Sequence, residues 1–347
     1  MAGSSGSPLR VARPVYEHPW AVRFCHWANA VSVTVLAMSG LQIFSAFPAF
    51  GPKIPQANLI DAVPEAVALG GWLGGALQWH FTFMWIFATT TLATVPENAV
   101  AQAAMVAREQ LVVAGLSLAI AAFEETSSAL QFEQLVTDGQ HVERGACLLR
   151  ISGGARPILS AERVALNFVQ RLSGVATFAS QFVQAVQGTK AKILDTRKTT
   201  PGWRRFEKYA VTCGGGQNHR VGLFDLILIK DNHLAALRNE KPNAIAAAVQ
   251  RARTKYPELK VEVETDTLEQ VEQAVAARAD IILLDNMSPA LLRSAVELVA
   301  GRAKTEASGG VNLGTVRAIA ETGVDFIRVG AITHSARAVD IALDFEP

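Results

Sequence analysis

Hydrophobic and polar positions follow two different patterns along the chain. Residues 26–50 and 69–95 contain no formal charge and are mostly apolar, whereas charges return at ordinary globular density after Glu97. Each uncharged run is long enough for a helix that crosses a bilayer, since about 20 apolar residues span its hydrocarbon core. The stretch 51–67 between them contains three prolines and is typical of a loop. The pattern predicts a two-helix transmembrane hairpin within residues 1–88.

The charges that flank this hairpin predict its orientation. Arg10, Arg13 and Arg23 precede the first run, whereas Lys53 is the only cation in the connecting loop. Because positive charge collects on the cytoplasmic side, we expect the N-terminus in the cytoplasm and, after two crossings, the rest of the chain there too. A cleaved signal peptide fits less well, because the apolar run is long and follows a long leader. The alternative is a buried helical hairpin of a soluble domain.

After the hairpin the pattern changes to that of a soluble protein. Residues 101–123 are helical in composition, with one charged interruption. Residues 130–149 are typical of short strands separated by the turn signals Asp-Gly and Arg-Gly. Together these patterns predict a small α/β sandwich domain over residues 89–160.

Strand and helix patterns then alternate through a second domain, residues 161–347. A long amphipathic pattern at 161–186 predicts a helix. Predicted strands follow at 192–196, 226–230, 260–264, 280–285, 304–308 and 325–329, with predicted helices at 244–253, 268–277, 289–300 and 313–322. Such alternation predicts parallel strands in a barrel or a doubly wound sheet. A barrel is favoured, because polar residues gather at or just past the strand ends, where β/α barrels carry their sites.

The composition narrows the class of partner. Formal net charge is +1, from 32 Lys and Arg against 31 Asp and Glu, so the balance does not point to nucleic acid. The three cysteines are widely spaced and odd in number, which gives neither a disulfide framework nor a metal knuckle. Anion binding must therefore come from local groups of cations.

Charged side chains at the predicted strand ends form such a group. The cations are Arg197, Lys198, His219, Arg220 and Lys230, and the acids are Glu264 and Asp285. Cations at one rim suit a multiply anionic substrate, with arginine preferred for carboxylates. Two carboxylates on neighbouring strands suit a Mg²⁺ ion that bridges phosphates. The turns Ser308-Gly309-Gly310 and Gly330-Ala331 follow the last two predicted strands, a common position for a backbone phosphate site.

Unusual short motifs occur in order between Glu162 and Val311, within the region that runs from about residue 90 to the end of the chain. They are Glu162-Arg163, Asp195-Thr196-Arg197-Lys198-Thr199, Gly214-Gly215-Gly216-Gln217-Asn218-His219-Arg220, Leu228-Ile229-Lys230-Asp231-Asn232-His233, Val261-Glu262-Val263-Glu264, Leu284-Asp285-Asn286 and Ser308-Gly309-Gly310-Val311. On these motifs the region resembles the quinolinate phosphoribosyltransferase family.

The resemblance implies a fold and a reaction. The fold is an α/β sandwich followed by an incomplete, roughly six-stranded α/β barrel of the type II phosphoribosyltransferase kind, assembled as a homodimer with a shared active site. The reaction converts quinolinate and phosphoribosyl pyrophosphate into nicotinate mononucleotide, CO₂ and pyrophosphate with Mg²⁺. This reaction belongs to de novo NAD biosynthesis.

The resemblance also implies a role for each motif residue. Quinolinate would be held by Arg197, Lys198, His219 and Arg220, together with Arg163 from the partner subunit. Lys198 and Lys230 would line the position between quinolinate and the sugar phosphates, and Glu264 and Asp285 would hold Mg²⁺ and the ribose hydroxyls. The 5-phosphate would be held by Ser308, Gly309, Gly310, Gly330 and Ala331.

The N-terminal part resembles a different family. The stretch from Glu17-His18-Pro19-Trp20 to His26-Trp27, followed by a predicted helix with Gly40, is similar to the start of membrane di-haem b-type cytochromes. This resemblance covers residues ~12 to 88 and makes His26 and His80 candidate ligands of a b-type haem. That family has further spanning helices and further histidine ligands, which this chain does not show. The alternative is therefore that both histidines are remnants.

The junction between the two parts departs from both families. Quinolinate phosphoribosyltransferases carry an acidic segment that ends in Gly-Asp-Leu-Thr-Thr ahead of the sandwich. Here Met84-Trp85-Ile86-Phe87 stands in that place, followed by a Thr-Thr-Leu-Ala-Thr stretch that ends at Thr94. No linker rich in Gly, Pro or Ser separates the parts. The junction predicts a fused or truncated reading frame whose barrel residues are intact.

Two other functions stay open at this point. One is a membrane b-haem electron-transfer subunit fragment fused to an inactive passenger. The other is a related enzyme that acts on a different pyridine carboxylate, because nicotinate phosphoribosyltransferases form a similar barrel. The arginine-rich group fits a dicarboxylate better than a monocarboxylate.

Overall fold

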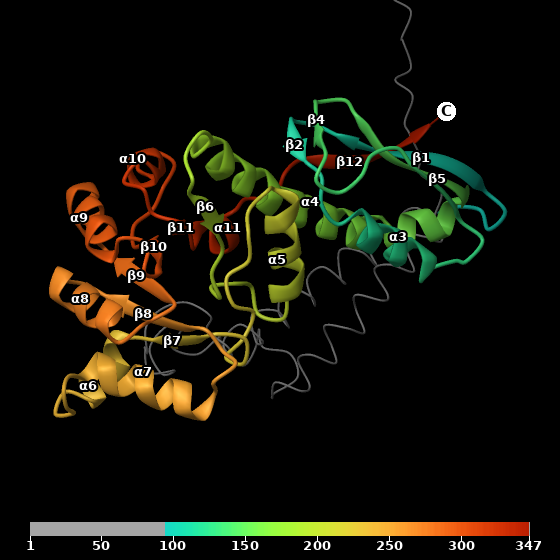
Figure 1. Ribbon diagram of the computed structural model, residues 1–347. Helices are drawn as coiled ribbons and strands as arrows, with labels where there is room; N and C mark the ends of the chain where they lie inside the picture. The colour runs from blue at the N-terminus through green and yellow to red at the C-terminus, as the bar shows by residue number, and fades with distance from the viewer. Residues whose placement is uncertain (1–93, 347) are drawn as a thin grey trace, which may run out of the picture. The chain divides into compact units, whose positions relative to one another are not determined.

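The computed structural model describes residues 94–346, which form two main β-sheets and the helices that cover them (Figure 1). The first sheet is antiparallel, with strand order β12-β1-β5-β3. Its strands are β1 (Val100–Ala107), β3 (Gln131–Gln134), β5 (Cys147–Gly154) and β12 (Ile341–Glu346). Helix α3 (Leu116–Glu124) and the first half of α4 (Ala155–Ala185) share an apolar core with it. A short pair, β2 (Leu111–Val112) and β4 (His141–Val142), completes this α/β sandwich.

The helix expected over residues 101–123 is wrong for its first part, which forms the interior strand β1. Ala103, Met105 and Ala107 alternate along β1 and are fully buried. Alanine favours helices by intrinsic propensity, but here pairing with β5 on one side and β12 on the other determines the conformation. Only the second part of the predicted helix exists, as α3.

The second sheet is an open barrel of six parallel strands in the order β6-β11-β10-β9-β8-β7. The strands are β6 (Lys192–Leu194), β7 (Ile227–Ile229), β8 (Val261–Thr265), β9 (Ile281–Asp285), β10 (Lys304–Ser308) and β11 (Phe326–Arg328). The helices are α5 (Arg204–Cys213), α6 (Asp231–Ala236), α7 (Ala244–Lys255), α8 (Leu268–Ala276), α9 (Pro289–Val299), α10 (Val316–Ala320) and α11 (Ala331–His334). Within the described chain the end strands β6 and β7 do not pair, so the predicted incomplete barrel is confirmed.

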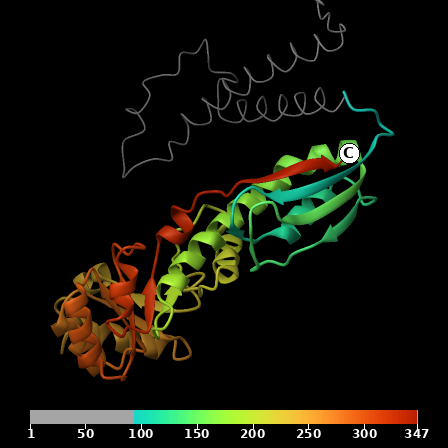
Figure 2. The ribbon, with the colours of Figure 1, turned by 90° about the horizontal axis from the view of Figure 1, so that it is seen from above.

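Helix α4 joins the sandwich to the barrel (Figure 2). Its first half contributes to the sandwich core, and its second half, from Leu172 onward, contributes to the barrel core. Near the start of the second half, Gly174 allows a close approach, since a Cβ atom there would overlap the carbonyl oxygen of Arg337. This approach brings the segment that leads to β12 against α4, and β12 then pairs with β1 in the first sheet.

Among residues 94–346, no helix combines the length and the apolar character that a membrane crossing needs. The longest helix there, α4, is amphipathic and carries Glu162, Arg163 and Arg171. The predicted hairpin, with His26 and His80, lies outside the described residues.

The close approach at Gly174 makes a testable prediction about stability. Gly174→Ala should lower the free energy of unfolding by about 1–3 kcal/mol, because the methyl group must displace the backbone at Arg337. Urea unfolding followed by circular dichroism measures the loss. Gln184→Ala, an exposed position of the same helix, is the control and should stay within about 0.5 kcal/mol of the parent. Equal unfolding midpoints for Gly174→Ala and the parent would contradict the packing described here.

Candidate active site

A cavity of about 770 Å³ opens at the carboxyl ends of the barrel strands. Its lining includes every predicted site residue of the barrel, namely Arg197, Lys198, His219, Arg220, Lys230, Glu264, Asp285, Ser308, Gly309, Gly310, Gly330 and Ala331. Residues that were not predicted complete it: Thr196, Leu228, Asn286, Val311, Arg328 and His334. Parallel strands end on the same face, so side chains far apart in the sequence meet there.

Arg163 is the one residue of the predicted quinolinate and phosphoribosyl pyrophosphate site that does not line this cavity. It lies on α4, where 70% of its side chain is exposed, and its guanidinium is 3.7 Å from the carboxylate of the adjacent Glu162. The neighbouring Val164 is also half exposed. Within one subunit, therefore, Arg163 contributes nothing to the cavity.

The two acids of the rim each have a polar neighbour. The Lys230 ammonium lies 3.2 Å from Oε2 of Glu264, at the end of β8. The Asn286 amide donates to Oδ2 of Asp285, at the end of β9, at 2.7 Å. Carboxylates on adjacent strands are ligands that Mg²⁺ accepts together with substrate phosphates. Glu264 and Asp285 are the residues of the cavity that fit such an ion.

A buried ion pair holds the loop that carries His219 and Arg220. The Lys208 ammonium, on α5, lies 2.5 Å from Oδ1 of Asp195 and donates to the His219 carbonyl at 2.9 Å. The same Asp195 oxygen accepts the His219 backbone N–H at 2.8 Å. Burial raises the pKa of Asp195 and lowers the pKa of Lys208, because it penalises both charged forms. The pair fixes this loop to the end of β6.

A second network holds the segment that carries Lys198. The fully buried Glu207 carboxylate accepts from Arg171 at 2.6 Å and from the Thr200 hydroxyl at 2.8 Å. Arg171 also donates to the carbonyl of Thr333 at 2.6 Å, and the Thr333 hydroxyl donates to the Lys198 carbonyl at 2.7 Å. Helix α4 thereby supports this wall of the cavity.

The turn after β10 contributes an open part of the cavity wall. Gly309 and Gly310 have φ values of 94° and 60°, a left-handed conformation that favours glycine. A Cβ atom on Gly309 would also overlap the Asn286 side chain, whereas Gly310 faces open space. Backbone at this turn can therefore approach a ligand closely.

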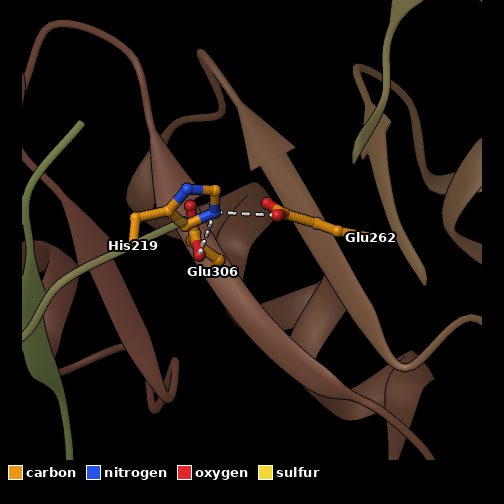
Figure 3. A group of neighbouring side chains, drawn as sticks. All are labelled: His219, Glu262 and Glu306. Atoms are coloured by element: carbon orange, nitrogen blue, oxygen red, sulfur yellow. Dashed lines mark hydrogen bonds and ion pairs between the residues drawn. The ribbon is translucent and has the colours of Figure 1, made fainter. Parts of the chain in front are cut away.

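A charged cluster that was not predicted lies beneath the cavity (Figure 3). Nε2 of His219 is 2.8 Å from Oε2 of Glu262 and 3.8 Å from Oε2 of Glu306. The Arg328 guanidinium lies 3.2 Å from Oε1 of Glu306. Burial, together with the neighbouring Glu262, raises the pKa of Glu306 well above its usual range. The sequence signal for Glu262 is its spacing of two from Glu264, which places both side chains on one face of β8.

Two family models cover the sandwich and the barrel. Residues 88–173 match the N-terminal domain, and residues 175–344 the C-terminal domain, of quinolinate phosphoribosyl transferase. The nicotinate-nucleotide pyrophosphorylase (carboxylating) of Mycobacterium leprae is 45% identical over 260 residues, which cover 74% of this chain and 90% of that protein. The chain belongs to the quinolinate phosphoribosyltransferase family. The chloroplastic family member of Arabidopsis thaliana is 43% identical over 272 residues, covering 74% and 77% of the two chains.

Solved structures of the family share this fold. The nicotinate-nucleotide pyrophosphorylase of Francisella tularensis superposes with a TM-score of 0.70 at 41% identity, covering 74% of this chain and 89% of that one. Human nicotinic acid phosphoribosyltransferase has a TM-score of 0.53 at 13% identity. At that identity the likeness concerns the fold alone.

The N-terminal part matches a different family model. Residues 17–106 match prokaryotic cytochrome b561, which confirms the resemblance to membrane b-type cytochromes. The match contains His26 and His80 and overlaps the quinolinate phosphoribosyltransferase match over residues 88–106. All of strand β1 except Ala107 lies in the overlap, and the strand belongs to the sandwich sheet.

Breaking the buried Asp195–Lys208 ion pair should lower the free energy of unfolding far more than breaking an exposed ion pair. Lys208→Met should lower the free energy of unfolding by about 3 kcal/mol or more, because it leaves the Asp195 carboxylate buried without its cation. The matched control is Lys190→Met, which removes a 55% exposed lysine 3.5 Å from Asp325 and should cost less than about 1 kcal/mol. Urea unfolding of both variants makes the comparison. Similar losses in the two would mean that Lys208 does not hold the loop as described.

Proposed function

We propose that this protein transfers a phosphoribosyl group to quinolinate and releases CO₂, forming nicotinate mononucleotide for NAD biosynthesis. The observation that carries the proposal is a single cavity in which cations, two carboxylates and open glycine turns meet at the strand ends. The relatives from Mycobacterium leprae and Arabidopsis thaliana bear the name of this activity, nicotinate-nucleotide pyrophosphorylase (carboxylating). The substrates, metal and residue roles proposed below are those that the family resemblance implies, and the chemistry of the cavity lining supports them.

Quinolinate is proposed to bind at the cationic side of the cavity. Arg197, Lys198, His219 and Arg220 line that side. Guanidinium groups bind carboxylates through paired hydrogen bonds, so several of them suit a substrate with two adjacent carboxylates. A monocarboxylate such as nicotinate would leave part of this charge without a partner.

Phosphoribosyl pyrophosphate is proposed to bind along the acidic rim and the glycine turns. Glu264 and Asp285 would hold its ribose hydroxyls and a Mg²⁺ ion, which offsets the charge of the pyrophosphate when bound. Ser308, Gly309, Gly310, Gly330 and Ala331 would surround the 5-phosphate. Lys198 and Lys230 would then face the space between the two substrates, where charge develops as the pyrophosphate leaves.

The reaction needs positioning and charge stabilisation more than proton transfer. The bond from C1 of the ribose to pyrophosphate breaks and leaves its electron pair on the pyrophosphate, while the quinolinate nitrogen forms a bond to C1. The quaternary nitrogen then accepts electron density as the adjacent carboxylate leaves as CO₂. The electron pair of that broken bond takes a proton from solvent. We assign no nucleophilic side chain.

A homodimer is proposed because both Arg163 and an apolar surface are exposed. A groove between α3 and α4 is lined by Leu118, Ala121, Ala122, Val164 and Phe168, among others. Beside it the rings of Phe168 and Trp203 stack with centroids 5.0 Å apart. A second copy of the chain would cover this surface and bring its Arg163 to the cavity of the first. Quinolinate would then be held by both subunits.

The N-terminal 88 residues are proposed to anchor the enzyme to the membrane as a two-helix hairpin, with the sandwich (89–160) and the barrel (161–347) in the cytoplasm. The uncharged runs and the cytochrome b561 match support this assignment. The same match supports a second candidate function, a b-haem electron-transfer fragment with His26 and His80 as ligands. A haem absorbance band in purified protein that makes no nicotinate mononucleotide would favour the second candidate.

Arg197→Ala tests the assignment of the dicarboxylate. The variant should raise the quinolinate KM roughly 10- to 100-fold, because a charged hydrogen bond contributes about 1.5–3 kcal/mol. The KM for phosphoribosyl pyrophosphate should change by less than about twofold, since the other substrate makes no proposed contact with Arg197. Arg293→Ala, on the exposed face of α9, is the control. An unchanged quinolinate KM in Arg197→Ala would sink the substrate assignment.

Mixed dimers test whether the active site is shared. Arg163→Ala and Lys198→Ala should each be almost inactive alone, because each removes a group from every site. Coexpression with two affinity tags gives mixed dimers that contain one site with both groups intact. Random pairing should therefore restore about a quarter of the wild-type sites in the mixture. No recovery in purified mixed dimers would place Arg163 outside the partner's site.

A further inference from the structure

Two buried glutamates form a charged layer under the cavity. Glu262 lies two residues before Glu264 on β8, and Glu306 lies two residues before Ser308 on β10. Side chains two apart on a strand share a face, so both glutamates point into the barrel interior one layer below the cavity lining. Neither is exposed to solvent. A buried carboxylate is costly unless it is paired. The groups that face Glu262 and Glu306 therefore determine how these side chains are accommodated.

The contacts of the two glutamates differ. Glu262 is hydrogen-bonded to Nε2 of His219 at 2.8 Å, whereas Glu306 is 3.8 Å from the same nitrogen. Arg328 lies closer to Glu306, at 3.2 Å, than to Glu262, at 3.9 Å. We assign the hydrogen of the His219–Glu262 contact to Nε2, with the Glu262 oxygen as the acceptor.

This contact determines which edge of the imidazole ring is left for a ligand. In Figure 3 the other ring nitrogen, Nδ1, lies on the side of the ring away from Glu262. His219 also lines the cavity, although only 5% of its side chain is exposed. Its backbone is held separately by the Asp195–Lys208 pair. Backbone and ring are therefore fixed by different partners, as expected for a side chain with one required orientation.

A metal ion is the other chemistry that this cluster suggests. The nearest ligand atoms of His219, Glu262 and Glu306 lie within 4.8 Å of one another, which is close enough for a shared ion. Arg328, however, already brings a permanent positive charge within 4 Å of both carboxylates. The geometry therefore favours a cluster that orients the histidine.

We propose that Glu262 is a positioning residue for His219, which it holds as an Nε2–H donor so that Nδ1 meets the dicarboxylate substrate. The inference rests on the proposed function, because quinolinate is the ligand that Nδ1 would meet. The Nδ1 edge of the ring is then the one left to meet a substrate carboxylate in the cavity. An amide can turn either its oxygen or its nitrogen toward Nε2, so Glu262→Gln no longer fixes the orientation of the ring.

The kinetic test is Glu262→Gln, which keeps the size of the side chain. We expect the quinolinate KM to rise roughly tenfold, the ratio that about 1.4 kcal/mol produces, while kcat and the KM for phosphoribosyl pyrophosphate change by less than about twofold. Asp325→Asn is the control, because this acid pairs with Lys304 at the opposite, amino end of the strands. It should lower stability without moving the quinolinate KM. Equal KM values for Glu262→Gln and the control would overturn the proposal.

The spectroscopic test does not depend on turnover. Two-bond proton–nitrogen correlation spectra of protein labelled with ¹⁵N-histidine, assigned by their loss in His219→Asn, show which ring nitrogen carries the proton. We expect a protonated Nε2 in the parent and in Asp325→Asn, and a changed pattern in Glu262→Gln. A parent ring protonated on Nδ1 alone would overturn the proposal, as would a stoichiometric divalent metal that Glu262→Gln loses. If the parent made no nicotinate mononucleotide, the proposed function would fail while these spectra still decided the role of Glu262.

Discussion

The arrangement of the cavity depends on one buried ammonium group. Lys208 on α5 binds both the Asp195 carboxylate and the His219 carbonyl, and so joins the end of β6 to the loop that carries two cations of the cavity. A charged group buried this deeply is stable only beside its partner. The Asp195–Lys208 pair therefore fixes the position of the loop as well as contributing to stability. Without it, His219 and Arg220 would lie on a long loop free to move away from Arg197 and Lys198.

Other buried ion pairs hold the remaining parts of the cavity wall in the same way. Glu207 and Arg171 tie the Lys198 segment to α4, and Arg328 lies between the cavity and the glutamates beneath it. The cations of the rim therefore stand on a rigid scaffold before any ligand arrives. Two anionic substrates can be brought together there at little further cost, because the dipoles and charges are already oriented. This fits a reaction that proceeds by positioning and needs no nucleophilic side chain.

Most of the barrel and of its cavity lining could be predicted from the sequence, because the patterns that indicate barrel strands are local. Most barrel strands contain apolar residues followed by a polar residue at the end, with β10 (Lys304–Ser308) the clearest exception, and the parallel order places those ends together. Strand β1 was not predicted, because its alanines favour a helix. Its strand conformation depends on pairing with β12 on one side and β5 on the other, which the local sequence does not show. The return of β12 to the first sheet was missed for the same reason, since no local pattern reveals a pairing partner more than 200 residues away. The spacing of Glu262 from Glu264 shows that they share a face of β8, but no local pattern shows that Glu262, Glu306 and Arg328 meet, because their meeting depends on strand register.

The central claim is that one cavity brings quinolinate and phosphoribosyl pyrophosphate together for transfer and decarboxylation. The most direct measurement supplies the full-length protein, purified in detergent with Mg²⁺, with quinolinate labelled with ¹³C at the carboxylate beside the ring nitrogen. Mass spectrometry then follows product and gas. The account predicts unlabelled nicotinate mononucleotide and labelled CO₂ in equal amounts, formed only when phosphoribosyl pyrophosphate is present. Folded, dimeric protein that forms no product, or product that keeps the label, would contradict it.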